Sequence, residues 1–184
     1  MDLAGPKIRT SDVAFGGHTT RLVAGDRLRL FAALPLSVDA TAPFAALVAQ
    51  PEIVPSLIVG DRVRYNDGQM EGLVEEATSG SVLIRIERAK SGGTKLKPEK
   101  GLNFPDSKLS LSPLTAKDES DLSAVVELAD LVGYSFVSRP EDLAHLHALL
   151  PSLSATGRTM GLIAKVERPE AVSNLPTLIA QVLG

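Results

Sequence analysis

The sequence predicts an α/β fold, an incomplete TIM-type (β/α) barrel of about three βα units with a small all-β barrel or sandwich domain inserted into it. Gly161–Ala164 is a short apolar run bounded by polar residues, as expected for a strand buried on both faces in a parallel sheet. Residues 11–99 instead alternate charged and apolar residues between turn signals, as antiparallel strands do. Residues 100–184 alternate strand-like and helix-like patterns, which favours a parallel sheet or barrel.

Residues 1–10 are expected to form the first barrel strand. Asp2 stands at its end, and Gly5-Pro6 is a turn signal. Because the strand has neither a cap nor a lead-in, we expect the chain to be cut from a longer one.

Residues 11–99 are expected to form the inserted β-domain. Gly25–Leu30 and Gly60–Tyr65 are near copies, each a Gly-Asp turn followed by alternating charged and apolar residues. Asn66–Gly68 predicts a hairpin turn. Phe44–Ala49 fits either a helical turn or a strand, and both alternatives stay open.

The connector at residues 90–100 contains glycines and several lysines. Its functional interpretation is a flexible arm that carries lysines to a phosphate. Its ordinary interpretation is a solvated loop, since glycines and lysines are common in loops.

Residues 100–184 are expected to supply the remaining barrel units. Thr115 is a good N-cap residue, with Asp118 three residues on, and an apolar stripe at helical spacing follows. Residues 130–137 read as a strand, and a helix is expected from Pro140, with acidic residues near its positive end. His145 and His147 lie two positions apart on that helix and do not face one another, so we interpret them as helix surface or core rather than as a metal site.

Lys165 and Glu167 follow the apolar run Gly161–Ala164 directly. Side chains alternate along a strand, so these two point the same way and Val166 points to the opposite face. Pro169 then suits the first turn of a helix. An ammonium and a carboxylate at the C-terminal end of a strand stand where α/β barrels place their chemistry. The alternative is a solvated ion pair, which contributes little.

The composition excludes several classes of protein. With 44% apolar and 22% charged residues among 184, the chain is globular rather than disordered. No apolar run approaches the ~20 residues of a membrane span, and no signal sequence begins the chain, so we predict a soluble cytoplasmic protein without a membrane partner. A chain without cysteine forms no disulfide and no Cys-ligated zinc site. The formal charge of −3 argues against a nucleic-acid partner.

Six motifs of this chain, in their order along it, resemble the pyruvate kinase family. Asp2–Arg9 resembles the family's Asp-x-x-Gly-Pro-[Lys/Glu]-Ile-Arg at the end of the third barrel strand, and Lys165-Val-Glu167 resembles the Lys-Ile-Glu of the fifth. Tyr65–Gly68 resembles the turn of the family's inserted domain, and Lys100–Pro105 resembles the segment where the chain re-enters the barrel. Ala116–Leu122 resembles the start of the next helix, and Ser135–Val137 resembles the end of the fourth strand. Each motif alone is weak, but six in the family's order are strong evidence, and the resemblance covers essentially the whole chain.

The resemblance implies transfer of a phosphoryl group from phosphoenolpyruvate to ADP, giving pyruvate and ATP, with Mg²⁺ and K⁺ as cofactors. Lys165 would stabilise the moving phosphoryl group, and Glu167 would be a ligand of Mg²⁺, a cation that prefers oxygen. Asp2 would bind K⁺, with the Leu3 carbonyl beside it. The groups that would hold nucleotide or phosphate are Arg9, Lys100 and, on a β-domain that closes as a lid, Asp67. Cations and the exclusion of water are what phosphoryl transfer requires.

The chain also departs from the family pattern. Ser138 stands where an arginine usually follows Ser-Phe-Val, Arg168 stands where an asparagine follows Lys-Ile-Glu, and the loop Ser91–Glu99 is extended. The family's earlier and later barrel strands are missing. We therefore expect a fragment that is inactive in isolation and that forms a homo-oligomer through exposed barrel edges.

Two other functions are alternatives to the kinase hypothesis. One is a non-catalytic pyruvate kinase-like module that binds a ligand or regulates a partner. The other uses Lys165 as the Schiff-base lysine of a barrel aldolase. That chemistry needs an uncharged amine, whereas the neighbouring Glu167 would keep Lys165 charged.

Overall fold

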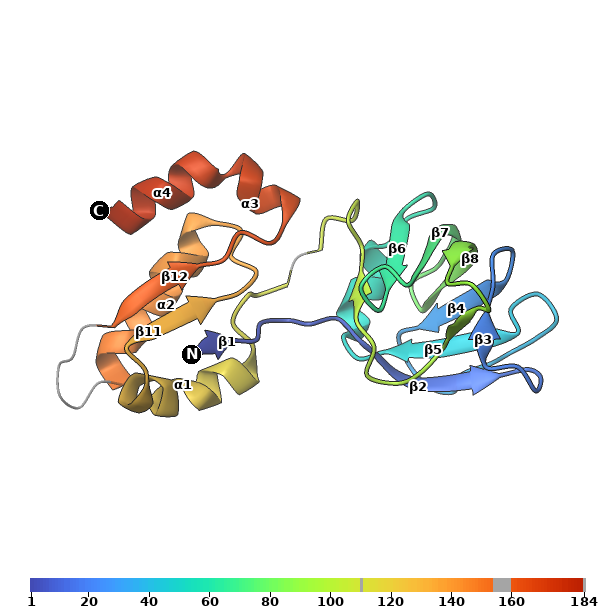
Figure 1. Ribbon diagram of the computed structural model, residues 1–184. Helices are drawn as coiled ribbons and strands as arrows, with labels where there is room; N and C mark the ends of the chain where they lie inside the picture. The colour runs from blue at the N-terminus through green and yellow to red at the C-terminus, as the bar shows by residue number, and fades with distance from the viewer. Residues whose placement is uncertain (110, 154–159, 184) are drawn as a thin grey trace. The chain divides into compact units, whose positions relative to one another are not determined.

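The computed structural model describes residues 1–109, 111–153 and 160–183. The chain forms two units, one built from Met1–Pro6 and Leu111–Gly184 and the other from Lys7–Ser110 (Figure 1). The β unit thus extends beyond residues 11–99 at both ends. Arg9 forms a β-bridge with Gly101, and strand β10 (Leu102–Asn103) pairs with β6 (Arg62–Tyr65), which keeps these flanking segments with the β unit. None of the helices in the described part of the chain is long and apolar enough to cross a membrane.

The α/β unit contains a three-stranded parallel sheet in the order β1, β11, β12. Its strands and helices are β1 (Asp2–Leu3), α1 (Ala116–Leu128), β11 (Leu131–Tyr134), α2 (Pro140–Leu153), β12 (Gly161–Ala164), α3 (Pro169–Ser173) and α4 (Leu175–Leu183). The expected alternation of strand and helix is therefore present. Because β11 is the middle strand, groups on β1 and β12 are two strands apart.

The two faces of this sheet differ in burial. On one face Val132 and Tyr134 are fully buried against apolar residues of α1, α2 and α4, which form a single core. On the other face Leu131 and Ile163 are 51% and 50% exposed. The expectation that Gly161–Ala164 is buried on both faces is therefore wrong, since helices pack on one face and Ile163 points to the other.

The β unit is built around a seven-stranded, mostly antiparallel sheet in the order β10, β6, β7, β8, β4, β5, β2. Besides β6 and β10 its members are β2 (Thr10–Phe15), β4 (Arg27–Phe31), β5 (Phe44–Val48), β7 (Met70–Ala77) and β8 (Ser81–Ala89). A small second sheet pairs β3 (Arg21–Leu22) with β9 (Thr94–Lys95), and a 3-10 helix spans Pro51–Ser56. The segment from Phe44 is thus a strand, not a helical turn, and its residues are almost all buried.

The repeated Gly-Asp turns have the same geometry in both copies. Gly25 and Gly60 each have φ +95°, a left-handed conformation that suits glycine. The following aspartate then accepts a backbone N–H three residues back, Asp26 from Val23 at 2.7 Å and Asp61 from Ile58 at 3.1 Å. The predicted hairpin is also present, with Asn66 and Asp67 both left-handed between β6 and β7.

Candidate active site

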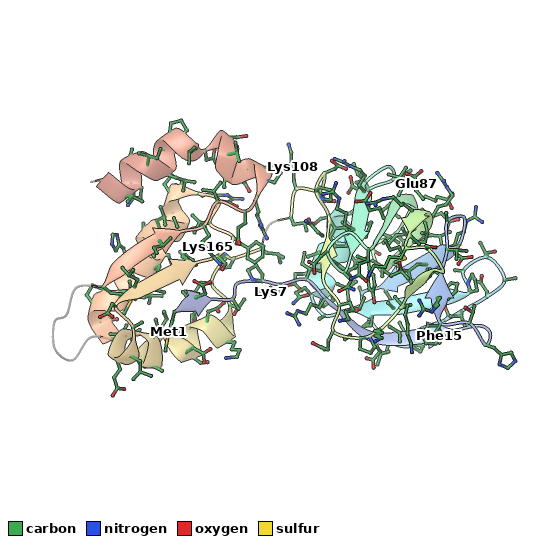
Figure 2. The ribbon with its side chains drawn as sticks, in the orientation of Figure 1. Met1, Lys7, Phe15, Glu87, Lys108 and Lys165 are labelled. Atoms are coloured by element: carbon green, nitrogen blue, oxygen red, sulfur yellow. The ribbon has the colours of Figure 1, made fainter. Side chains whose placement is uncertain are left out.

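Lys165 lies at the C-terminal end of β12, on the half-exposed face of the sheet (Figure 2). Its backbone N–H donates to the Tyr134 carbonyl at 2.9 Å, which extends the pairing of β12 with β11 by one residue. Its ammonium Nζ lies 3.3 Å from Asp2 Oδ2 and 3.8 Å from Glu167 Oε1. The structure thus brings together three of the predicted site residues, with Asp2 reaching Lys165 and Glu167 from 163 positions before Lys165 in the chain.

Gly133 makes the approach of Asp2 to Lys165 possible. Asp2 pairs with Gly133 on the middle strand, and its carboxylate must pass over that strand to reach β12. A Cβ at position 133 would lie 2.0 Å from Asp2 Oδ1, far closer than any real contact. Only glycine fits there without displacing the carboxylate. A lone glycine inside a strand was the available sequence signal, since it often marks a close approach.

Glu167 is held by the backbone of the loop after β11. Its Oε2 accepts the N–H of Phe136 at 2.9 Å, and its Oε1 is left on the side of Lys165. Phe136 is left-handed, with φ +59°, and the Arg168 guanidinium lies over its ring at 5.6 Å from the centroid. Burial lowers the pKa of Arg168, which nevertheless stays charged because guanidinium is so basic. The sequence reasoning did not find Phe136 as a site residue.

The Leu3 carbonyl, predicted to face K⁺, accepts the buried hydroxyl of Ser135 at 2.7 Å. A carbonyl oxygen has two lone pairs, so this bond leaves a second acceptor position. The Asp2 side chain on the same strand is 68% exposed. An oxygen pair of this kind fits a cation that takes oxygen ligands.

Asp118 fixes the loop that leaves β1. The residue is buried, and its carboxylate accepts the backbone N–H groups of Ala4 at 2.9 Å and Gly5 at 3.2 Å. The same carboxylate accepts the N–H and the hydroxyl of Thr115 in a capping box at the start of α1. Thr115 and Asp118 carry the expected N-cap signal, but the bonds to Ala4 and Gly5 have no sequence signature. Asp118 is thus a structural carboxylate.

The donor set fits Mg²⁺ only in part. Within residues 1–109, 111–153 and 160–183, no group of three or more His, Cys, Asp or Glu side chains gathers as a metal cage. Mg²⁺ nevertheless is commonly held by one or two carboxylates together with substrate phosphates and water. Glu167 fits that pattern as a single protein ligand of Mg²⁺, because the Phe136 N–H engages Oε2 and leaves Oε1 for the metal.

The predicted residues of the β unit gather around one backbone junction. The Thr10 N–H donates to the Lys100 carbonyl at 2.9 Å, and the Lys100 N–H donates to Thr10 Oγ1 at 3.1 Å, which places Lys100 beside Arg9. The Arg9 guanidinium lies 3.9 Å from the exposed Glu99 carboxylate. The Asn66 N–H donates to the Gly101 carbonyl at 2.8 Å, so the hairpin that carries Asp67 adjoins the same junction.

The connector ahead of Lys100 is tied to the sheet rather than free. The Tyr65 hydroxyl accepts the Lys97 N–H at 2.9 Å, and Thr10 Oγ1 donates to the Lys97 carbonyl at 2.8 Å. Leu96 between these bonds is buried. Burial raises the pKa of Tyr65, so its hydroxyl stays protonated at neutral pH. The flexible-arm interpretation therefore does not hold for the segment next to Lys100.

Comparisons with known proteins agree on one family. The family model of the pyruvate kinase barrel domain matches residues 1–183. The chain is 32% identical to "Pyruvate kinase 2" of Synechocystis over 100% of this chain and 30% of that protein, and 31% identical to "Pyruvate kinase" of Methylorubrum extorquens over 97% and 34%. A crystal structure described as a pyruvate kinase from Cryptosporidium parvum matches with a TM-score of 0.80 at 22% identity, over 98% of this chain and 36% of that one. The chain spans about a third of the length of these relatives.

Proposed function

Since the chain belongs to the pyruvate kinase family, we propose that the full product of its gene transfers a phosphoryl group from phosphoenolpyruvate to ADP. The observation that supports this most is the set of three charges at the strand ends, where the Lys165 ammonium lies 3.3 Å from Asp2 and 3.8 Å from Glu167. We further propose that the three-stranded sheet is part of an incomplete TIM-type barrel and that the β unit is its inserted domain. The cytoplasmic location and the homo-oligomeric state stay predictions.

In the proposed reaction the bond between phosphorus and the enol oxygen of phosphoenolpyruvate breaks, and a bond from phosphorus to a terminal oxygen of ADP forms. The enolate that is released takes up a proton on carbon and becomes pyruvate. This transfer needs no protein nucleophile, because positioning and positive charge around the phosphoryl oxygens lower its barrier. We assign that charge to Lys165, whose ammonium is held in place by the carboxylates of Asp2 and Glu167.

The metal assignments follow from the oxygen atoms at hand. Mg²⁺, when bound, would neutralise and orient phosphate oxygens. We assign Glu167 to hold it, because the Phe136 N–H engages only Oε2. We assign K⁺ to the Asp2 carboxylate and the Leu3 carbonyl, which are adjacent on β1.

For the β unit we propose that Arg9 and Lys100 hold nucleotide or phosphate, with Asp67 close by. The support is the shared junction, where backbone bonds keep the two cationic residues together. The role of this unit as a lid stays a prediction from the sequence.

The test is pyruvate formation from phosphoenolpyruvate and ADP by the full gene product, with Lys165→Met and Glu167→Gln as variants. We expect each variant to lower kcat by about 100- to 1,000-fold, the usual effect of removing one group that stabilises charge in the transition state. Lys117→Met is the matched control, since its ammonium pairs with Asp121 on an exposed turn of α1 and should leave kcat unchanged. Wild-type kcat in Lys165→Met would contradict the proposal.

We propose that the 184-residue chain alone forms no pyruvate. Its Lys165 and Glu167 side chains remain 30% and 37% exposed, so water is not excluded from the charges that would act on the phosphoryl group. Measurable pyruvate formation by the purified chain would refute this statement.

The second candidate is a non-catalytic pyruvate kinase-like module that binds a ligand or regulates a partner. Ser138, at a position where the family has arginine, is buried, and its N–H donates to Asp142 at 2.8 Å. The adjacent Arg139 pairs with Glu170 at 3.1 Å, so its guanidinium is engaged elsewhere. A full gene product that binds Mg²⁺ and phosphoenolpyruvate without turnover would favour this candidate.

A further inference from the structure

Phe136 has an unusual backbone for so bulky a residue. Its φ of +59° lies in the left-handed region, which residues other than glycine and asparagine rarely adopt. Such conformations persist only where the surroundings hold them, and they cluster at functional sites. The conformation has a consequence here, because it directs the Phe136 N–H to Glu167 Oε2 at 2.9 Å.

Two contacts hold the Phe136 ring. The ring packs so closely on Gly5 that a Cβ there would lie 2.6 Å from Phe136 Cδ2. The Arg168 guanidinium carbon lies over the ring, 5.6 Å from its centroid, which is within the range of a cation–π contact. A planar guanidinium covers a ring face better than an ammonium does. The ring is thus fixed by the loop after β1 and by the residue that follows Glu167.

The backbone of Arg168 is fixed at the start of helix α3. It is the N-cap residue of α3, with an extended backbone, and Pro169 follows at the first helical position. Its carbonyl accepts the Ala171 N–H at 3.1 Å, which ties it to the start of the helix. Arg168 therefore approaches Phe136 from a constrained position directly beside Glu167.

We propose that Arg168 is a positioning residue for Glu167 and acts through Phe136. By stacking on the ring it keeps Phe136 in the left-handed conformation, whose N–H then holds Glu167 Oε2 and leaves Oε1 towards Lys165. The inference deepens the proposed function and rests on the role assigned there to Glu167. It also accounts for a cation at a position where the family resemblance implies asparagine.

The first test is amide hydrogen exchange of the 184-residue chain, followed residue by residue by NMR. Arg168→Ala should speed exchange of the Phe136 amide by roughly tenfold or more, because its bond to Glu167 opens more often. The Ser138 amide, bonded to Asp142, should keep its wild-type rate. Arg139→Ala is the matched control, since it removes a neighbouring guanidinium that pairs with Glu170 and not with Phe136.

Arg168→Lys decides the matter if Arg168→Ala does not fold. It keeps the charge but loses the planar group, so the Phe136 amide should exchange at a rate between those of the wild type and a Glu167→Gln variant. If Arg168→Ala folds and its Phe136 amide exchanges at the wild-type rate, the inference is wrong. If only Arg168→Lys folds, a wild-type exchange rate of the Phe136 amide in that variant would overturn it.

The second test separates positioning from general support of the fold. Mn²⁺ serves as the probe for the divalent cation, and its binding to the full gene product is measured by water-proton relaxation with phosphoenolpyruvate present. Arg168→Ala should weaken Mn²⁺ binding about tenfold, in the range seen when a group behind a metal ligand is removed, and Arg139→Ala should not. Equal Mn²⁺ affinity in Arg168→Ala and the wild type would overturn the role towards Glu167. If exchange and Mn²⁺ binding change as expected but no pyruvate forms, the proposed function fails and this inference stands.

Discussion

Asp118→Ala is expected to destabilise the α/β unit by about 2–3 kcal/mol. Loss of the capping box at Thr115 should cost about 1 kcal/mol. Among the described residues Asp118 is the acceptor of the buried Gly5 N–H, and leaving this donor without it should cost roughly 1–2 kcal/mol more. Ala4 is exposed, so water can replace the carboxylate at its N–H. The effect combines the start of α1 with the loop that directly follows the proposed K⁺ ligands on β1.

The assay is urea unfolding of the 184-residue chain, followed by far-UV circular dichroism of the α-helices, which all belong to the α/β unit among the described residues. Hydrogen exchange at Ala4 and Gly5 gives the local readout and should accelerate in the variant. The matched control is Asp121→Ala, one turn further along α1, where an exposed ion pair with Lys117 should contribute little to stability. If Asp118→Ala costs no more than Asp121→Ala, the reasoning is wrong.

Three further predictions concern β11. In Gly133→Ala the new Cβ, 2.0 Å from Asp2 Oδ1, should force the exposed carboxylate away from Lys165; a crystal structure of the variant should lack that ion pair, while the urea midpoint changes little. The Tyr134 hydroxyl is buried and has no hydrogen-bond partner among the described residues, so Tyr134→Phe should not lower stability. Burial raises the pKa of Tyr134 above its ordinary 10.0, so on raising the pH the unfolded state loses the phenol proton before the folded state does. The stability of the wild type should therefore fall above about pH 10, by up to ~1.4 kcal/mol per pH unit. Unfolding at a series of alkaline pH values should show a smaller fall in Tyr134→Phe, with Tyr65 supplying the rest; equal slopes would exclude Tyr134 as the source.

Local sequence signals predicted much of the fold. Asn66 and Asp67 adopt the left-handed turn that their residue types favour, and Thr115 caps α1 with Asp118 as its partner. These features depend on residues within three or four positions of each other. The end of β12 was placed correctly for the same reason, since a short apolar run precedes Lys165. The strand predicted over residues 1–10 is only Asp2–Leu3, because the chain from Lys7 onward belongs to the β unit.

The rest of the site depends on contacts that no local pattern contains. Asp118 reaches Ala4 across 114 positions, and Glu167 meets Phe136 across 31. The passage of Asp2 over Gly133 follows from the strand order, which places β11 in the middle. Residue spacing along one strand cannot reveal which residue lies on the next. The burial of Gly161–Ala164 was overestimated because an apolar run does not show how many faces are covered.

The half-exposed Leu131 and Ile163 affect how this chain should be handled at the bench. A dye whose fluorescence rises when it binds exposed apolar surface would already be fluorescent with the folded protein. Val172 and Ile179 add to that surface, because they are 62% and 50% exposed. Thermal melts read by such a reporter would start from a high baseline and understate cooperativity. Intrinsic tryptophan emission cannot replace it, because the chain has no Trp. Calorimetry or circular dichroism is therefore the sound choice for ranking variants.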